Sequence, residues 1–88
     1  MMTIDDFNDK YEEYLGEGHY GLSIANQKVI EFLDDIFQDL TKIPDFKYYQ
    51  IKMKFGYSRF YADNVGEKLS SLIERQINRL IKDDESKT

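Results

Sequence analysis

Apolar residues recur at three- and four-residue intervals in three segments of the chain, which is the spacing of amphipathic helices. The segments cover residues 4–15, 22–41 and 65–82. Thr3 with Asp6 three residues later predicts the start of the first helix, and Asn64 with Glu67 predicts the start of the third. A Gly-Glu-Gly run and a single proline predict the ends of the first two. Ile24 falls on the polar side of the second segment, so it is exposed, bound to a partner, or placed before the true start of that helix.

Between residues 45 and 62 the period changes to two, which is the spacing of β-strands. A turn at Gly56 and Tyr57, with glycine at the first central position, is typical of type II′. That turn places Lys54 opposite Arg59. The core face of the hairpin then consists of Ile51, Met53, Phe60 and Ala62.

A two-stranded hairpin is not stable alone in water, so the helices must cover its apolar face. We therefore predict an α+β fold in the order α-α-β-β-α, with the helices packed on one face of a two-stranded antiparallel hairpin. Residues 1–82 are expected to form a single domain, and residues 83–88 a frayed acidic C-terminal tail.

The chain has 88 residues and no cysteine, which excludes disulfides, a thiolate nucleophile and cysteine-based metal sites. Its apolar content of 41% is too high for a wholly disordered protein. The N-terminus lacks the pattern of a signal peptide, and no window approaches the roughly 18 apolar residues of a membrane span. We expect a cytoplasmic protein with no membrane partner.

Charge is distributed unevenly around the total of −5. Residues 1–40 carry ten acidic and two basic residues, a net charge of −8, whereas residues 41–82 carry nine basic and four acidic residues, a net charge of +5. Such an asymmetric field steers charged partners.

The acidic residues of the first two predicted helices follow one another at four-residue steps. These two acidic rows are Asp5, Asp9 and Glu13 in the first helix, and Glu31, Asp35 and Asp39 in the second. Each like-charge pair at this spacing costs about 0.2–0.5 kcal/mol, so the four pairs cost roughly 1–2 kcal/mol together. The rows are a solubilising surface or a docking surface for a basic protein.

The predicted outer face of the hairpin combines positive charge with aromatic rings. It consists of Tyr48, Lys52, Lys54, Arg59 and Tyr61. Basic residues interleaved with tyrosines can grip phosphates and stack on bases, which is how proteins hold single-stranded nucleic acid. The alternatives are a solvated face, or one that meets an acidic protein; the low pI of about 4.7 argues against a dedicated nucleic-acid binder.

Enzymatic chemistry has little support in the sequence. His19 is the single histidine, and no nucleophile motif surrounds it. The glycines at positions 16, 18 and 21 lack the strand that a dinucleotide-binding loop requires. We therefore expect no catalytic residue, no cofactor and no metal site.

The hairpin resembles a signature of known proteins. Residues 50–61 read Q-I-K-M-K-F-G-Y-S-R-F-Y, which is similar to the pattern Q-[IV]-K-x-K-F-G-x-L-R-F-Y of small uncharacterised phage and prophage proteins. Ser58 stands where the signature has leucine. The resemblance implies a phage or mobile-element origin, and for a phage-encoded protein the expected location is the host cell cytoplasm.

The leading hypothesis is a non-enzymatic phage or mobile-element protein that inhibits or modulates a host protein. Its acidic rows would dock on a basic surface of a host or phage protein and imitate nucleic acid, and a defence system is one candidate target. One alternative is a nucleic-acid-binding module that uses the basic hairpin. Another is a structural homodimer in which one subunit's hairpin meets the other's acidic helices.

Overall fold

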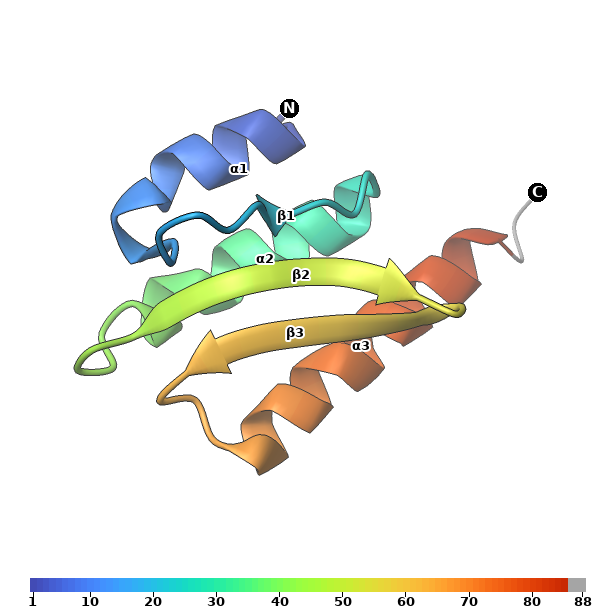
Figure 1. Ribbon diagram of the computed structural model, residues 1–88. Coiled ribbons are helices and arrows are strands. Elements are labelled where there is room, and N and C mark those ends of the chain that lie inside the picture. The colour runs from blue at the N-terminus through green and yellow to red at the C-terminus, as the bar shows by residue number, and fades with distance from the viewer. Residues whose placement is uncertain (86–88) are drawn as a thin grey trace.

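The computed structural model describes residues 1–85, which form an α+β domain with three α-helices and one mixed sheet (Figure 1). In chain order the elements are α1 (Ile4–Lys10), the 3-10 helix η1 (Glu12–Tyr14), β1 (Gly21–Leu22), α2 (Gln27–Leu40), β2 (Lys47–Lys54), β3 (Tyr57–Asp63) and α3 (Glu67–Glu85). The strand order is β1-β2-β3, with β1 parallel and β3 antiparallel to β2.

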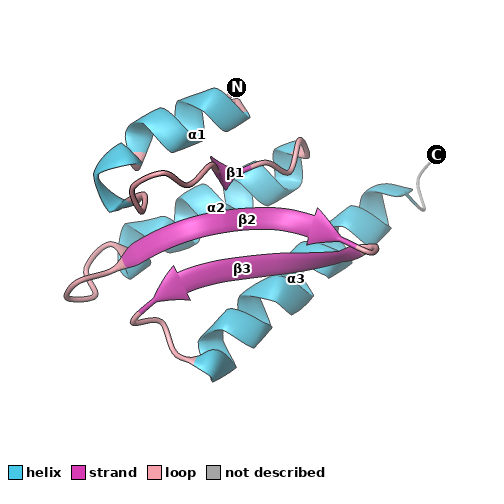
Figure 2. Ribbon diagram, viewed as in Figure 1, coloured by secondary structure: helices cyan, strands magenta, loops and turns pink. Residues whose placement is uncertain are grey.

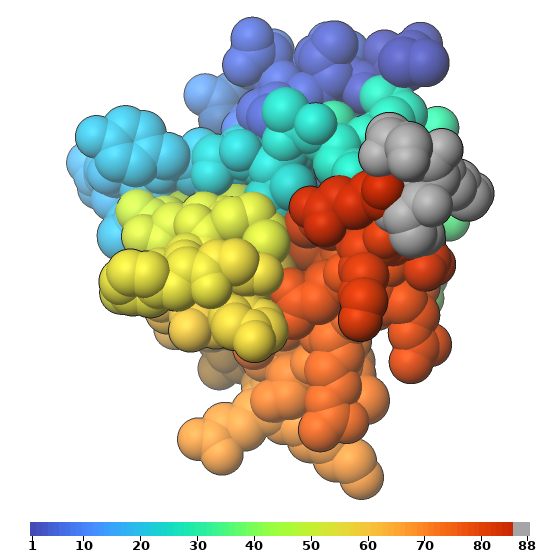
Figure 3. Space-filling view, turned by 90° about the vertical axis from the view of Figure 1, so that its right-hand side faces the viewer, coloured from blue at the N-terminus to red at the C-terminus, as the bar shows by residue number. Residues whose placement is uncertain are grey.

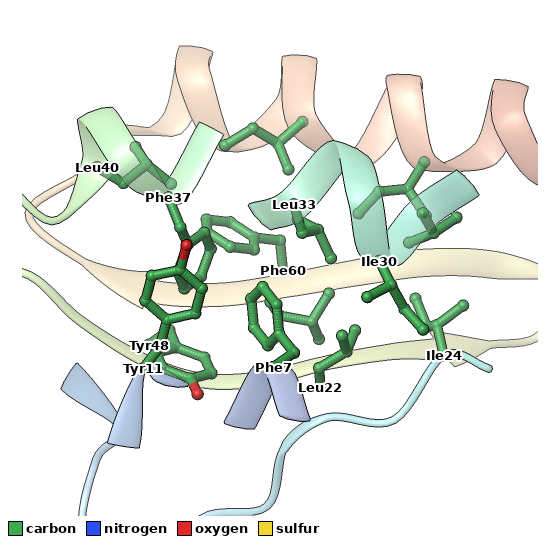
Figure 4. Packing of buried hydrophobic residues seen from close by; sticks show 14 of the residues in the cluster. Phe7, Tyr11, Leu22, Ile24, Ile30, Leu33, Phe37, Leu40, Tyr48 and Phe60 are labelled. Carbon is green, nitrogen blue, oxygen red and sulfur yellow. The ribbon is translucent and has the colours of Figure 1, made fainter. Parts of the chain in front are cut away.

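The helices cover one face of the sheet and leave the other bare. Helices α2 and α3 lie behind the sheet in the view of Figure 2, and α1 lies beyond β1. The core fills the space between these helices and the strands, where Phe7, Phe37 and Tyr48 meet edge to face (Figure 4). The Phe7 and Phe37 ring centres are 4.9 Å apart, within the range in which such pairs are favourable.

Strand β1 was not expected, so the α+β class was predicted correctly but the two-stranded hairpin and the α-α-β-β-α order were wrong. Gly21 and Leu22 pair in parallel with Gln50 and Ile51. A strand of two residues has no alternation to detect, and Leu22 was therefore assigned to the second helix. That helix begins only at Gln27, where the side chain of the preceding asparagine caps it by accepting a hydrogen bond from the backbone of Val29. Ile24 is buried in the core and precedes the helix, which confirms the third of the alternatives given for it.

The ends of the other helices also differ from prediction. Thr3 is the expected N-cap and also forms a capping box with Asp6, but α1 ends at Lys10 and a 3-10 turn follows. At α3, the carbonyl of Gly66 accepts the first helical hydrogen bond, from Ser70. Asn64 is not the cap that its spacing predicted, because its backbone has a φ of 66° and its side chain donates to the carbonyl of Asp45.

Helix α3 continues to Glu85, three residues beyond its expected end. Asp84 accepts a hydrogen bond from Asn26 and forms an ion pair with Lys28, which tie the end of α3 to the start of α2. The expected tail of residues 83–88 therefore begins inside α3, and residues 86–88 lie outside the described residues.

The hairpin turns one residue earlier than predicted. Phe55 and Gly56 are its central residues, with φ of 54° and 82°, the signs of a type I′ turn. Lys54 therefore pairs with Tyr57, and Arg59 lies opposite Lys52. The partner strand has moved by two positions relative to the prediction. Because side chains alternate with a period of two, the same side chains still share each face. Met53, however, was predicted in the core and is 38% exposed.

A β-bulge at Tyr49 reverses the alternation at the start of β2. The register passes from Tyr48 opposite Ala62 to Gln50 opposite Tyr61, which leaves Tyr49 unpaired. Tyr48, predicted on the outer face, is therefore fully buried. Burial and the charge of Glu12 raise its pKa to about 12.

Side chains form hydrogen bonds with backbone groups at both outer edges of the sheet. At β1, the amide of Asn8 accepts a hydrogen bond from the backbone N–H of Leu22 and donates to the carbonyl of the same residue, both at 3.0 Å. At β3, the N–H of Ser58 donates to Asn78 Oδ1 at 2.7 Å, and the N–H of Phe60 donates to Glu74 Oε2 at 2.9 Å.

Candidate functional site

The bare face of the sheet presents three cross-strand pairs of polar and aromatic side chains. We call this surface the open face: it consists of Gln50 opposite Tyr61, Lys52 opposite Arg59, and Lys54 opposite Tyr57. These residues alternate along the strands with Ile51, Ser58 and Phe60, which are buried against the helices. The open face therefore follows directly from the hairpin register.

Two positive charges lie directly opposite each other in the middle of this surface. Lys52 and Arg59 are cross-strand partners, an arrangement that is destabilising for like charges. Neither side chain forms an ion pair with any residue in the range 1–85. Arg59 donates only to the carbonyl of the preceding serine, at 3.3 Å. The fold thus holds an uncompensated positive pair on an accessible surface.

A hollow lies beside this pair, towards β1. It has a volume of about 440 Å³, and its walls are His19, Tyr49, Gln50 and Tyr61. The volume lies within the range of small-molecule sites. Tyr61 is 43% exposed and makes no ring contact within the described chain, and the Gln50 amide makes no hydrogen bond there. One aromatic wall and one amide are therefore free to meet a ligand.

The opposite wall of the hollow, Tyr49, is held in place from three sides. The His19 ring meets it edge-on, with ring centres 4.8 Å apart. A Cβ atom at Gly16 would lie 2.2 Å from the Tyr49 ring, so the glycine allows the ring to rest against the backbone. The Tyr49 hydroxyl donates to Asp63, a hydrogen bond that raises the pKa of the tyrosine.

The structure brings together four of the five residues predicted for the outer face of the hairpin: Lys52, Lys54, Arg59 and Tyr61. Sequence reasoning missed Gln50 and Tyr57 on the open face and Tyr49 in the hollow, and it placed His19 in a loop without a role. A turn centred on Phe55 and Gly56 would have put Tyr57 on the outer face. The bulge and the loop before β1 depend on tertiary pairing, which no local pattern signals.

The six carboxylates of the acidic rows are exposed, as expected, but they are not all on α-helices. Glu13 lies in η1, beyond the end of α1, so it does not continue the row of Asp5 and Asp9. Three like-charge pairs at four-residue spacing remain, which lowers their cost to roughly 0.6–1.5 kcal/mol. Asp39 lies 3.8 Å from the ammonium of Lys42.

A separate carboxylate, Asp34, joins α1 to α2. It accepts from Lys10 Nζ at 2.8 Å and from the Tyr11 hydroxyl, which also accepts from Gln38 at 2.9 Å. Burial tends to raise the pKa of Asp34, but the hydrogen bonds from Lys10 and Tyr11 outweigh it and hold the pKa below its usual value. Burial and the same carboxylate raise the pKa of Tyr11.

Within residues 1–85, no group of three or more histidine or acidic side chains is placed to hold a metal ion. No helix in the same range is long and apolar enough to cross a bilayer.

Fold and surface together define a small α+β domain with a three-stranded mixed sheet, helices on one face and a basic aromatic surface on the other. Comparison with known proteins finds no matching family model, no matching curated protein and no matching solved structure.

Proposed function

We propose that this protein binds single-stranded nucleic acid on its open face. The observation that supports this function is the Lys52–Arg59 pair, which lies between tyrosines and has no acidic partner among residues 1–85. Phosphates would neutralise the pair, and a base would stack on the exposed ring of Tyr61. A sheet face carries such side chains on a rigid support, so little ordering is needed on binding.

The overall acidity of the chain does not oppose this proposal at physiological salt. The molecule spans 40 × 28 × 23 Å, and α2 with its acidic row lies on the side of the sheet away from the open face (Figure 2). The Debye length is about 8 Å at 0.15 M salt, and the acidic helices are therefore screened from a ligand on the open face. The local charge of the face, rather than the net charge of the chain, governs its affinity.

Fluorescence anisotropy with a labelled single-stranded oligonucleotide tests this function. We expect binding at low salt that weakens as salt rises. Replacing Lys52 and Arg59 with glutamine should weaken it and reduce the slope of log affinity against log salt by roughly 1.4, because each phosphate contact on a single strand contributes about 0.7.

The matched control is Lys68→Gln with Arg79→Gln, which removes the same charge from exposed positions on α3. Equal loss in the two double variants would mean that net charge alone drives binding. Absence of any binding at low salt by the wild-type protein would refute the nucleic-acid function.

The acidic rows support a second candidate, in which the protein docks on a basic surface of another protein. Of the six carboxylates, only Asp39 lies within 4 Å of a basic group in the described range, so five are available to a partner. A host protein that normally holds nucleic acid would present such a surface, and the protein would then act as its inhibitor. Together with the resemblance of the hairpin, this candidate corresponds to a phage or mobile-element protein directed against a host function.

Reversing charge on α2 tests the second candidate. The triple variant Glu31→Lys, Asp35→Lys and Asp39→Lys should lose a partner that the wild-type protein captures from a host lysate. A control that reverses Glu12, Glu17 and Glu67 makes the same change in net charge and should keep that partner. Retention by the first variant would contradict a role for the α2 row.

A further inference from the structure

We infer that the hollow beside the Lys52–Arg59 pair is a nucleobase site, in which a base stacks on Tyr61 while the amide of Gln50 reads its edge. The ligand chemistry is a nucleotide, either free or within a strand. The inference rests on the proposed nucleic-acid function and adds the position at which a base, rather than a phosphate, is recognised.

The two sides of the hollow have different properties. Tyr49 is fixed by His19, by the close approach of Gly16 and by its hydrogen bond to Asp63. Tyr61 has no such restraints within residues 1–85 and is 43% exposed. Tyr61 is therefore the surface with an unoccupied aromatic face, and Tyr49 is a preformed wall that limits what can enter.

Gln50 gives the hollow a means of discrimination. It is the cross-strand partner of Tyr61, so its amide and the Tyr61 ring leave the sheet at the same level. A carboxamide presents one donor and one acceptor side by side, which matches the donor–acceptor pairs on base edges. A phosphodiester offers acceptors only, so a base edge matches both halves of this amide better than the phosphate does.

Charge complementarity identifies the rest of the ligand. The next outward pair along both strands is Lys52 with Arg59, two residues from Gln50 and Tyr61. Two residues of a strand span about 6.6 Å, a distance that a base and its own phosphate can bridge. An anionic group on the positive pair thus brings its base to the hollow, whereas Asp63, which accepts from the Tyr49 hydroxyl, lies at the far end of β3.

The test compares labelled hexanucleotides with a hexamer of abasic sugar-phosphate units, by anisotropy at low salt. We expect the abasic hexamer to bind at least tenfold more weakly. We also expect Tyr61→Leu to weaken binding of the base-bearing hexamer about tenfold, since one stacked base contributes about 1.4 kcal/mol. Gln50→Leu should reduce the differences in affinity among hexamers of the four bases.

The matched control is Tyr57→Leu, which removes a tyrosine from the open face but not from the hollow. It should weaken binding less than threefold. Circular dichroism confirms that each variant is folded; Tyr57 and Tyr61 are both exposed, so leucine leaves the core intact.

The outcomes separate this inference from the proposed function. Equal affinity for base-bearing and abasic hexamers, or equal loss in Tyr57→Leu and Tyr61→Leu, would overturn the base site and leave phosphate binding on the open face intact. Equal affinity for a hexaglutamate peptide would overturn both, because it would show that any polyanion binds.

A wild-type protein that binds no oligonucleotide would refute the proposed function. The base site is then tested separately, by its binding of free nucleotides. In a titration with adenosine, guanosine, cytidine and uridine monophosphates, shifts of the Gln50 side-chain amide in nuclear magnetic resonance spectra would support a site for free nucleotides. No shift with any of the four would overturn it.

Discussion

At the scale of single residues, Phe55 is the clearest conflict between a side chain and its backbone. It occupies the first central position of the hairpin turn with a φ of 54°, and its side chain is 87% exposed. A left-handed backbone costs a residue other than glycine roughly 1–2 kcal/mol. A side chain this exposed gains little free energy from burial to offset that cost. The ammonium of Lys54 lies 5.8 Å from the centre of the ring and contributes at most a weak cation–π contact.

Replacing Phe55 with asparagine should therefore stabilise the protein. Asparagine tolerates the left-handed conformation at this turn position, so we expect the free energy of unfolding in urea to rise by about 1 kcal/mol. Tyr57→Asn, two residues later and on a regular strand, should produce no increase. A lower unfolding midpoint for Phe55→Asn would show that the phenyl ring stabilises the folded protein.

Asp34 should make the free energy of unfolding depend on pH in the acidic range. Its folded pKa is lowered, so its contribution is fully present above the unfolded pKa of about 3.9 and is lost as pH falls through the folded value. The difference in unfolding free energy between wild type and Asp34→Asn should therefore shrink between about pH 6 and about pH 3. Asp35→Asn, at an exposed neighbour outside the Lys10–Tyr11 network, is the control. A constant difference for Asp34→Asn would contradict the assignment.

At the scale of elements, the sequence predicted those features that depend on local periodicity. The three helices, the N-cap at Thr3 and the hairpin all follow from spacing within a few residues. The features it missed depend on pairing between distant segments: strand β1 exists because residues 21 and 22 meet β2, and the bulge at Tyr49 adapts β2 to both neighbours. The position of the turn was predicted wrongly for a third reason: a phenylalanine occupies a turn position that glycine or asparagine usually takes.

For the candidate site the same division holds. Lys52, Lys54, Arg59 and Tyr61 were predictable, since an error of two positions in register leaves each residue on its own face. The hollow was not predictable, because His19 and Gly16 reach Tyr49 only through the loop that leads into β1.

Gly21 should be essential for the placement of β1. It has a φ of 74°, and a Cβ atom there would lie 2.4 Å from the side-chain oxygen of Asn8, which binds the backbone of Leu22. Gly21→Ala should therefore lower the free energy of unfolding by about 2–4 kcal/mol, from backbone strain and the displaced amide together.

Gly18→Ala is the matched control for that variant. Gly18 has a similar φ of 79°, but a Cβ atom there meets nothing within 4 Å. Its cost should be about 1–2 kcal/mol, from backbone strain alone. Equal losses in the two variants, measured by urea denaturation, would mean that the Asn8 contact adds nothing.

At the scale of the whole molecule, the sheet and helices separate charges of opposite sign. The outward row on α2 belongs to the helical layer, and Lys52 and Arg59 belong to the opposite surface (Figure 1). Figure 3 shows the end of the hairpin in yellow beside the red end of α3, with the helical layer and the sheet seen from the side. The acidic row on α2 and the Lys52–Arg59 pair should therefore influence each other through the electrostatic field, which depends on ionic strength, rather than through direct contact.

The triple variant Glu31→Lys, Asp35→Lys and Asp39→Lys tests this separation by its effect on oligonucleotide affinity. At about 0.15 M salt the affinity should stay within roughly twofold of wild type. At about 0.01 M salt, where the Debye length reaches roughly 30 Å, it should rise several-fold. The same increase at both salt concentrations would show that the α2 row contacts the ligand directly.

The side chains along the two outer strands have a consequence for self-association. An exposed strand edge recruits strands from neighbouring copies, which leads to domain swapping and fibril growth. Here the Asn8 amide binds both the N–H and the carbonyl of Leu22 at one border, and Asn78 and Glu74 accept from the N–H groups of Ser58 and Phe60 at the other. The sheet can therefore expose a face rich in tyrosine at high concentration without being extended strand by strand into a polymer.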